Sequence, residues 1–513
     1  MKIKNKQFDA LALVSLVNSI IAIIAVALCV YGFNRSELIS APSIFISILL
    51  MISVIISSHF SWRFEQSELS YLNCLLSVYI WPRLAQYSVA PDIVIFPADS
   101  IGGQNLSIGL FWFTAFYIVT VFAFTLARRF FRAKNLALQH SSNRLKTKII
   151  VGALVVIIGF LVEGHFLISS SNSPYQLFEN QTASDSSAAK ALNVFVAIDT
   201  SLVFLTYFVF VAISKSSQWK KIFGLTILLA VIHWPFFEIS ALFGSRGAGI
   251  KTIHVLLVMV LLFPKDWKVF SCAFSLGVAC VIVSLLDFSA ATQMRDFKRK
   301  MDAPFWEEIT SRVASEARFK AHSKEKQTPL ADILNRIGSL DYFVVTLSRS
   351  PAPGCIEDKI ALRQQAKSVA NWLALGTPFP EAKYGSPSKF GQCYRPHYPR
   401  QVRLNNENWT MAGTIFQFIG GFGLLIVGVY AFAVNAAQMM ARKYNNLFTR
   451  ISYITSFSTL SASPLFIMGL DHFVISLGTI ALRIMFFCII FYVAFWGIKH
   501  LGRMKLRKPK AAT

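Results

Sequence analysis

Apolar runs long enough to cross a lipid bilayer recur along most of this chain. Each run is roughly 18–25 residues long, and a helix of that length spans a hydrocarbon core of about 30 Å. Only 15% of the residues are charged, whereas about a quarter are charged in a typical soluble domain. In lipid, the backbone of such a run has to satisfy its hydrogen bonds internally, which a helix does. The sequence therefore predicts an all-α fold, a polytopic membrane helix bundle with one large external loop containing short helices.

Hydropathy and loop charge together predict about 12 transmembrane helices. The first run is expected to be retained, because it lacks the small-residue cleavage site of a signal peptide. The runs 69–82 and 250–263 are short, and are interpreted as re-entrant or tilted segments. The expected spans are 10–32, 42–59, 69–82, 107–126, 149–170, 190–213, 222–243, 250–263, 269–287, 411–438, 451–470 and 473–498.

Basic residues gather in every second loop between these spans. Residues 127–148 carry seven Lys and Arg and no acid, whereas residues 171–189 carry Glu179 and Asp185 and no Lys or Arg. An excess of Lys and Arg marks cytoplasmic loops, so both termini are predicted to be cytoplasmic. Most of the net charge of +24 then reports topology, and no nucleic-acid partner is implied. The expected organisation is helices 1 to 9 in 1–287, an external domain in 288–410, and helices 10 to 12 with a basic tail in 411–513.

The external loop is itself basic, with 19 Lys and Arg against 12 Asp and Glu in residues 288–410. Long loops are translocated largely regardless of charge, so the topology is unaffected, and an anionic substrate would account for the excess. Cys355 and Cys393 are the cysteines of this loop and are expected to form a disulfide on an oxidising face. No Cys or His pattern with metal-ligand spacing occurs, so neither a metal nor a cofactor is predicted.

Three ionisable residues fall inside the expected spans, namely Arg483, Asp199 and Glu238. Such groups are rare in lipid and are usually paired or functional. One interpretation is a structural ion pair of Arg483 with Asp199 or Glu238. The other is an anion-binding cavity that is open to the outer face.

Two further regions bring arginine to the predicted outer face. The motif GSRGAG at 244–249 places Arg246 between glycines, where it either lies at the interface beside a tight turn or binds phosphate oxygens. Arg395, His397 and Arg400 stand close together before span 411–438. They either flank the membrane interface or form a diphosphate site.

A helix is predicted inside the external loop, beginning at Thr328-Pro329. Its apolar residues recur at helical spacing up to Leu347, with Asp341 within the apolar stripe and Arg336 at its edge. A carboxylate on an apolar face needs a partner or a raised pKa. Asp341 is therefore expected either in a structural salt bridge or as a catalytic carboxylate.

The order of these features resembles the Wzy-type O-antigen and oligosaccharide repeat-unit polymerases. The features are the outer GSRG, a large external loop with NRIGSLDYF, and an Arg- and Pro-rich stretch running into NWTMAGTIFQFIGGFGLLIVGVY. The resemblance covers roughly residues 230–440. It implies a metal-independent glycosyltransferase of the C superfamily type in the bacterial inner membrane.

Such an enzyme joins repeat units carried on undecaprenyl diphosphate, and a chain-length regulator protein is the further partner considered. The reaction needs positive charge on the departing diphosphate and a base for the attacking hydroxyl. The resemblance assigns the base to His397 or Asp341, and the diphosphate contacts to Arg246, Arg336, Arg395 and Arg400. An O-antigen ligase-like transferase and a transporter or flippase of lipid-linked glycan remain the alternatives.

Overall fold

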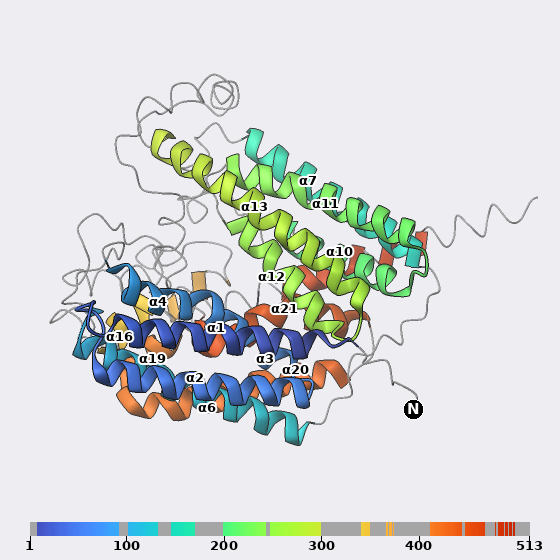
Figure 1. The fold of residues 1–513 in the computed structure, drawn as a ribbon. Coiled ribbons are helices and arrows are strands. Elements are labelled where there is room, and N and C mark those ends of the chain that lie inside the picture. The colour runs from blue at the N-terminus through green and yellow to red at the C-terminus, as the bar shows by residue number, and fades with distance from the viewer. Residues whose placement is uncertain are drawn as a thin grey trace, which may run out of the picture.

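The computed structural model describes residues 8–91, 101–131, 145–169, 198–242, 247–298, 340–348, 411–443 and 447–466, with parts of 366–373 and 478–497. Every regular element among these residues is a helix (Figure 1). Four of the described helices are long and apolar enough to cross a membrane. Their bounds are Ala10–Gly32, Ala41–Arg63, Gln104–Phe130 and Gly420–Lys443. The chain is thus a helical membrane protein, as the hydropathy pattern predicts.

The first group of helices contains these four long helices. They are α1 (Ala10–Gly32), α2 (Ala41–Arg63), α6 (Gln104–Phe130) and α20 (Gly423–Lys443). Polar residues begin two of them: the Asp9 side chain accepts from Leu11 N, and Ser40 and Ser43 form a capping box at α2. The helices are mostly apolar along their length, so tertiary packing and not capping alone determines where they pair.

Two pairs of consecutive helices in this group, which we call the interrupted crossings, are each separated by a short break. The segments α3 (Ser67–Tyr79) and α4 (Trp81–Val89) meet at Ile80, just before Pro82. Proline lacks the N–H that would continue the α3 ladder, which explains the break. Likewise α19 (Met411–Ile419) is separated from α20 by the short 3₁₀ turn Gly420–Phe422. Gly420 has φ +57°, a left-handed conformation that glycine adopts without strain.

The second group comprises five helices that lie above the first group in Figure 1. Their bounds are α7 (Leu145–Ser169), α10 (Ile198–Lys215), α11 (Trp219–Leu242), α12 (Gly247–Leu262) and α13 (Trp267–Lys298). Helix α21 (Leu447–Phe466) lies between the groups and contacts α20 and α3 on one side and α10 and α12 on the other. Each group has its own buried apolar cluster, and residues of α1, α3 and α21 belong to the second one.

The basic turns gather at one end of the molecule, which we call the basic end. Arg128 Nη2 donates to Phe64 O at 3.3 Å, and Lys265 Nζ bonds Glu65 at 2.6 Å. Lys268 Nζ donates to Ser216 O at 2.6 Å. The start of α1 is there too, because Ala10 N donates to Pro264 O at 2.6 Å. This grouping agrees with the predicted alternation of basic and non-basic loops.

The described helices overlap every expected span from 10–32 to 451–470. In the span 473–498, helical residues are described between 481 and 497. The count of twelve spans stays a prediction, because only four of the described helices reach full membrane-spanning length and hydropathy.

Candidate functional site

A short helix from the long loop 288–410 packs inside the bundle. This helix, α16 (Leu340–Ser348), contacts α6 and α19. Its apolar side chains, among them Phe343, Val344 and Val345, are completely buried. Phe343 lies edge-on to Phe113 of α6, with ring centroids 4.6 Å apart. The loop is therefore anchored within the helical core at the end opposite the basic end, which we call the far end.

The approach of α16 to α6 depends on Gly109. A Cβ atom at Gly109 would lie 2.7 Å from Val344 Cα, which is closer than two such atoms can pack. The absence of a side chain on this turn of α6 lets the two backbones touch. Gly109 lies in the second turn of α6. In the turn before it, Ser107 shares a hydrogen bond of 2.9 Å with Ser40, the residue that caps α2.

Asp341, in the first turn of α16, forms an ion pair with Arg83 of α4. Arg83 Nε donates to both carboxylate oxygens, at 2.8 and 3.1 Å, and Arg83 Nη2 donates to Oδ2. Tyr87, one turn further along α4, donates its hydroxyl to Oδ1. The pair is buried, with the side chains of Arg83 and Asp341 1% and 0% exposed. This bidentate contact is the usual geometry of an arginine–carboxylate pair.

These contacts decide between the roles open to Asp341. Both oxygens of the carboxylate accept from Arg83, and one accepts from Tyr87 as well. Arg83 is held in turn, since its Nη1 donates to Gln86 Oε1 at 2.6 Å. A carboxylate whose two oxygens already accept hydrogen bonds is well placed to orient a helix and poorly placed to accept a proton from a substrate. The geometry favours the structural salt bridge over the catalytic role for Asp341.

A second contact holds the other end of α16. Gln417 of α19 donates its amide to the carbonyl of Thr346. Phe416, beside Gln417, packs on Trp112 of α6 with ring centroids 4.7 Å apart. Helix α16 is thus fixed between α4 and α19, which are the far-end segments of the two interrupted crossings.

Other polar contacts lie deeper in the bundle. Asn73 of α3 donates to Ser57 and Ser58 of α2, both at 3.0 Å, and accepts from Tyr117 of α6 at 2.7 Å. His254 of α12 shares a hydrogen bond with the Tyr71 hydroxyl. These groups satisfy one another across helix interfaces, as polar side chains in lipid have to.

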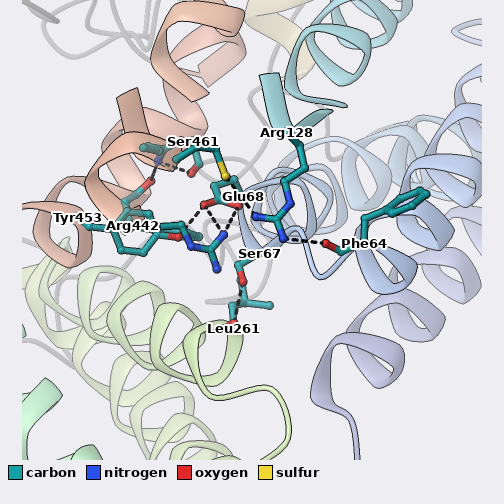
Figure 2. Close-up of polar contacts among 11 residues, drawn as sticks. Phe64, Ser67, Glu68, Arg128, Leu261, Arg442, Tyr453 and Ser461 are labelled. Atoms are coloured by element: carbon teal, nitrogen blue, oxygen red, sulfur yellow. Dashed lines mark hydrogen bonds and ion pairs between the residues drawn. The ribbon is translucent and has the colours of Figure 1, made fainter. Parts of the chain in front are cut away.

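A second buried ion pair joins three helices at the basic end (Figure 2). Arg442 Nη1 of α20 lies 3.2 Å from Glu68 Oε1 of α3, and the Tyr453 hydroxyl of α21 donates to the same oxygen at 2.6 Å. Next to Glu68, the Ser67 hydroxyl donates to Leu261 O of α12 at 2.8 Å. The start of α3 is therefore tied to α12, α20 and α21 together.

Most of the site residues expected from sequence lie outside the described residues. These are Arg246, Arg336, Arg395, His397, Arg400, Cys355 and Cys393. Asp199 and Glu238 belong to α10 and α11, where the helix backbone is described and their side chains are not. Arg483 is half-buried, and its pairing with Asp199 or Glu238 stays a prediction.

Arg83, Tyr87, Glu68 and Arg442 are the functional candidates that the sequence did not single out. Arg83 follows the apolar span 69–82 directly, and Glu68 precedes it. A charge at the edge of a span is ordinarily an interfacial residue, so position alone gave no signal. The informative feature is that the span 69–82 is too short to cross the membrane. Residues at both of its ends are therefore expected inside the bundle.

Among the described residues, no group of three or more His, Cys, Asp or Glu side chains could hold a metal ion. The described cysteines are all free thiols: Cys29, Cys74, Cys272, Cys280 and Cys488. Comparisons with family models, curated proteins and solved structures give no match for this chain.

Proposed function

We propose that this chain is a membrane glycosyltransferase that polymerises oligosaccharide repeat units carried on undecaprenyl diphosphate. The observation that carries the proposal is the anchoring of α16 inside the far end of the bundle by Arg83 and Asp341. This anchor holds one helix of the basic loop 288–410 at the end of the helices that is opposite the basic end. If the basic end is cytoplasmic, as the positive-inside rule predicts, the loop faces the outer side of the inner membrane.

In the proposed scheme, the anchor limits how far Arg336 can lie from the bundle. Arg336 precedes α16 by four residues, so holding Asp341 restricts where Arg336 can lie. Arg336, Arg246, Arg395 and Arg400 are the proposed contacts of the departing diphosphate, because a guanidinium stays charged and binds two phosphate oxygens at once. His397 is the proposed base for the attacking hydroxyl. Asp341 takes a positioning role in this scheme.

The reaction proposed is a group transfer at the anomeric carbon of the donor chain. The acceptor hydroxyl loses its proton to the base and forms the new glycosidic bond, while the bond to the lipid diphosphate breaks. The leaving diphosphate takes the electron pair, and positive charge on the protein stabilises it. The lipid diphosphate is already an activated leaving group, so the scheme needs no nucleotide sugar.

Deletion of the gene in its bacterial host tests the proposal. We expect surface glycan to shrink to single repeats and lipid-linked single repeats to accumulate. Complementation with Arg246→Ala should fail, and complementation with Arg129→Gln, an exposed charge at the basic end, should succeed. Finished polymer that accumulates on its lipid carrier would instead identify a ligase.

The orientation is tested separately by reporter fusions. Fusions at Asn135, Ser184 and Gly385 should report inside, outside and outside respectively. An inside signal at Gly385 would exclude an outer-face loop and the proposed reaction with it.

A transporter of lipid-linked glycan is the second candidate, and one observation favours it. The interrupted crossings α3–α4 and α19–α20 flank α16, and transporters often place discontinuous helices around a binding site. If the chain is a transporter, the deletion strain should accumulate lipid-linked repeats on the inner side of the inner membrane. An enzyme added from outside that membrane could not reach them. Accumulated repeats that are accessible from outside favour the polymerase.

A further inference from the structure

Two arginines lie near one buried carboxylate at the basic end, and one of them pairs with it. Arg442 of α20 binds Glu68 of α3 at 3.2 and 3.5 Å. Arg128 of α6 lies within electrostatic range of both, and Figure 2 shows Glu68 between the two guanidinium groups. One negative charge therefore stands between two positive ones.

Arg128 has no carboxylate within ion-pair distance among the residues that the structure describes. Its Nη2 donates to the Phe64 carbonyl at 3.3 Å, and its Nη1 points at Met439 Sδ at 3.4 Å. Glu65, which follows Phe64 in the chain, is engaged by Lys265 at 2.6 Å. A guanidinium with one carbonyl and one thioether as partners retains its full charge and has donors for an anion.

Arg442 itself and Gln66, two residues before Glu68 in the chain, have buried polar atoms without a partner among the described residues. Both amide atoms of Gln66 and the Nε of Arg442 make no hydrogen bond in the described part of the chain. Gln66 is 2% exposed and Arg442 is 7% exposed, so water from the bulk does not satisfy them. A buried polar atom left without a partner costs about 1–3 kcal/mol, so a bound ligand or an ordered water is expected here.

Large apolar side chains are exposed at the helix ends that surround Arg128, among exposed charges such as Arg129. Phe64, Phe130, Phe131 and Met440 are exposed at the ends of α2, α6 and α20. In a membrane helix bundle, these side chains face acyl chains at the level where the headgroups begin. A ligand of Arg128 is therefore expected to have an anionic head and an apolar body.

We propose that Arg128, with Arg442 behind it, forms a headgroup site for one anionic phospholipid at the basic end. Arg128 would bind the phosphate directly through its guanidinium, as arginine does in charge-assisted contacts. Arg442 would add positive charge, because its Nη1 is already used by Glu68. Basic pockets between transmembrane helices are known to bind anionic headgroups. The site lies at the opposite end from α16, so it is independent of the proposed reaction.

Native mass spectrometry of the full-length protein in detergent tests the site. The probes are dioleoyl phosphatidylglycerol, dioleoyl phosphatidylcholine and glycerol 1-phosphate. We expect one phosphatidylglycerol to be retained after delipidation and re-addition, and phosphatidylcholine to be retained at least about tenfold less. Arg128→Gln should weaken phosphatidylglycerol retention by about tenfold or more, the range expected for a lost hydrogen bond to a charged group.

Arg129→Gln is the matched control, because it removes the same charge from the neighbouring exposed residue. It should retain phosphatidylglycerol as the unmodified chain does. Equal retention by the Arg128→Gln and Arg129→Gln variants would overturn the site. If millimolar glycerol 1-phosphate displaced the lipid completely, the ligand would be a free phosphate compound and the lipid assignment would be wrong.

Discussion

Arg83 and Asp341 lie 258 positions apart in the chain and form a completely buried ion pair. The pair joins an early interrupted crossing to a helix of the long loop. Since a charge buried alone is costly, neither residue can leave its partner without a large penalty. The contact therefore fixes one register of α16 against α4, with Tyr87 and Gln86 as supporting partners.

The first prediction concerns this ion pair. Asp341→Asn and Arg83→Met should each destabilise the protein by about 3–5 kcal/mol, because each leaves one buried group uncompensated. The double variant Arg83→Met with Asp341→Asn removes both charges and should recover part of that loss. Thermal unfolding of the purified protein in detergent measures the effect. If the two single losses simply add in the double variant, the residues do not act as a pair.

The second prediction concerns the contact of α6 with α16. Gly109→Ala places a methyl group where Val344 Cα lies 2.7 Å away, so α16 has to move. Overpacking of this kind typically costs about 1–3 kcal/mol. We expect a lower melting temperature and faster proteolysis within residues 288–410. Gly224→Ala in α11 is the control, since nothing lies within 4 Å of its added Cβ, and its melting temperature should stay the same or rise slightly because alanine favours a helix.

Local patterns predicted most of the helices and little of the site. The apolar run 10–32 predicted α1 to the residue, because helix length in lipid follows from hydropathy. That the short run 69–82 is re-entrant or tilted stays a prediction, and Pro82 explains why two helices occupy it.

The limits of prediction are clearest at Asp341. Its place in an apolar stripe predicted that it needs a partner, and the structure supplies Arg83. Helical periodicity relates residues three or four apart, so it carries no information on a partner 258 positions away. The same holds for Glu68 and Arg442, which are 374 positions apart.

The third prediction contrasts an exposed pair with the buried ones. The hydrogen bond and charge of Glu65 raise the pKa of Lys265. A raised pKa in the folded state stabilises the protein below the ordinary lysine pKa of about 10.4, and this contribution is lost as pH rises through the raised value. The Lys265 side chain is 55% exposed, so the effect should stay below about 1 kcal/mol.

Lys265→Gln should therefore lower the melting temperature slightly at pH 7, and less at high salt, where exposed pairs are screened. Lys220→Gln, an exposed lysine of the start of α11, is the control and should have no effect. A loss in Lys265→Gln as large as in Asp341→Asn would contradict the exposed character of this pair.

The fourth prediction concerns the expected disulfide. Cys355 and Cys393 are expected to be bridged, and closing a loop of this length contributes about 4 kcal/mol in the chain-entropy model. Mass mapping without reduction should find one peptide pair joined by this bridge. Two free thiols would remove the disulfide and would also argue against an oxidising outer face for the loop.

The last prediction tests the charge balance at the basic end. Glu68→Gln leaves Arg442 and Arg128 facing each other without the carboxylate between them, and it removes the ionised partner of a buried guanidinium. A loss of about 3–5 kcal/mol is expected for such a break. Adding Arg128→Gln to Glu68→Gln removes one of the two repelling charges, so the double variant should melt higher than Glu68→Gln alone.

Glu65→Gln is the control for loss of an acid, and its effect should be small because Glu65 pairs with an exposed lysine. If the double variant melts lower than Glu68→Gln, repulsion between the two arginines is not what destabilises the single variant. Arg128 would then stabilise the fold through its contacts with Phe64 and Met439.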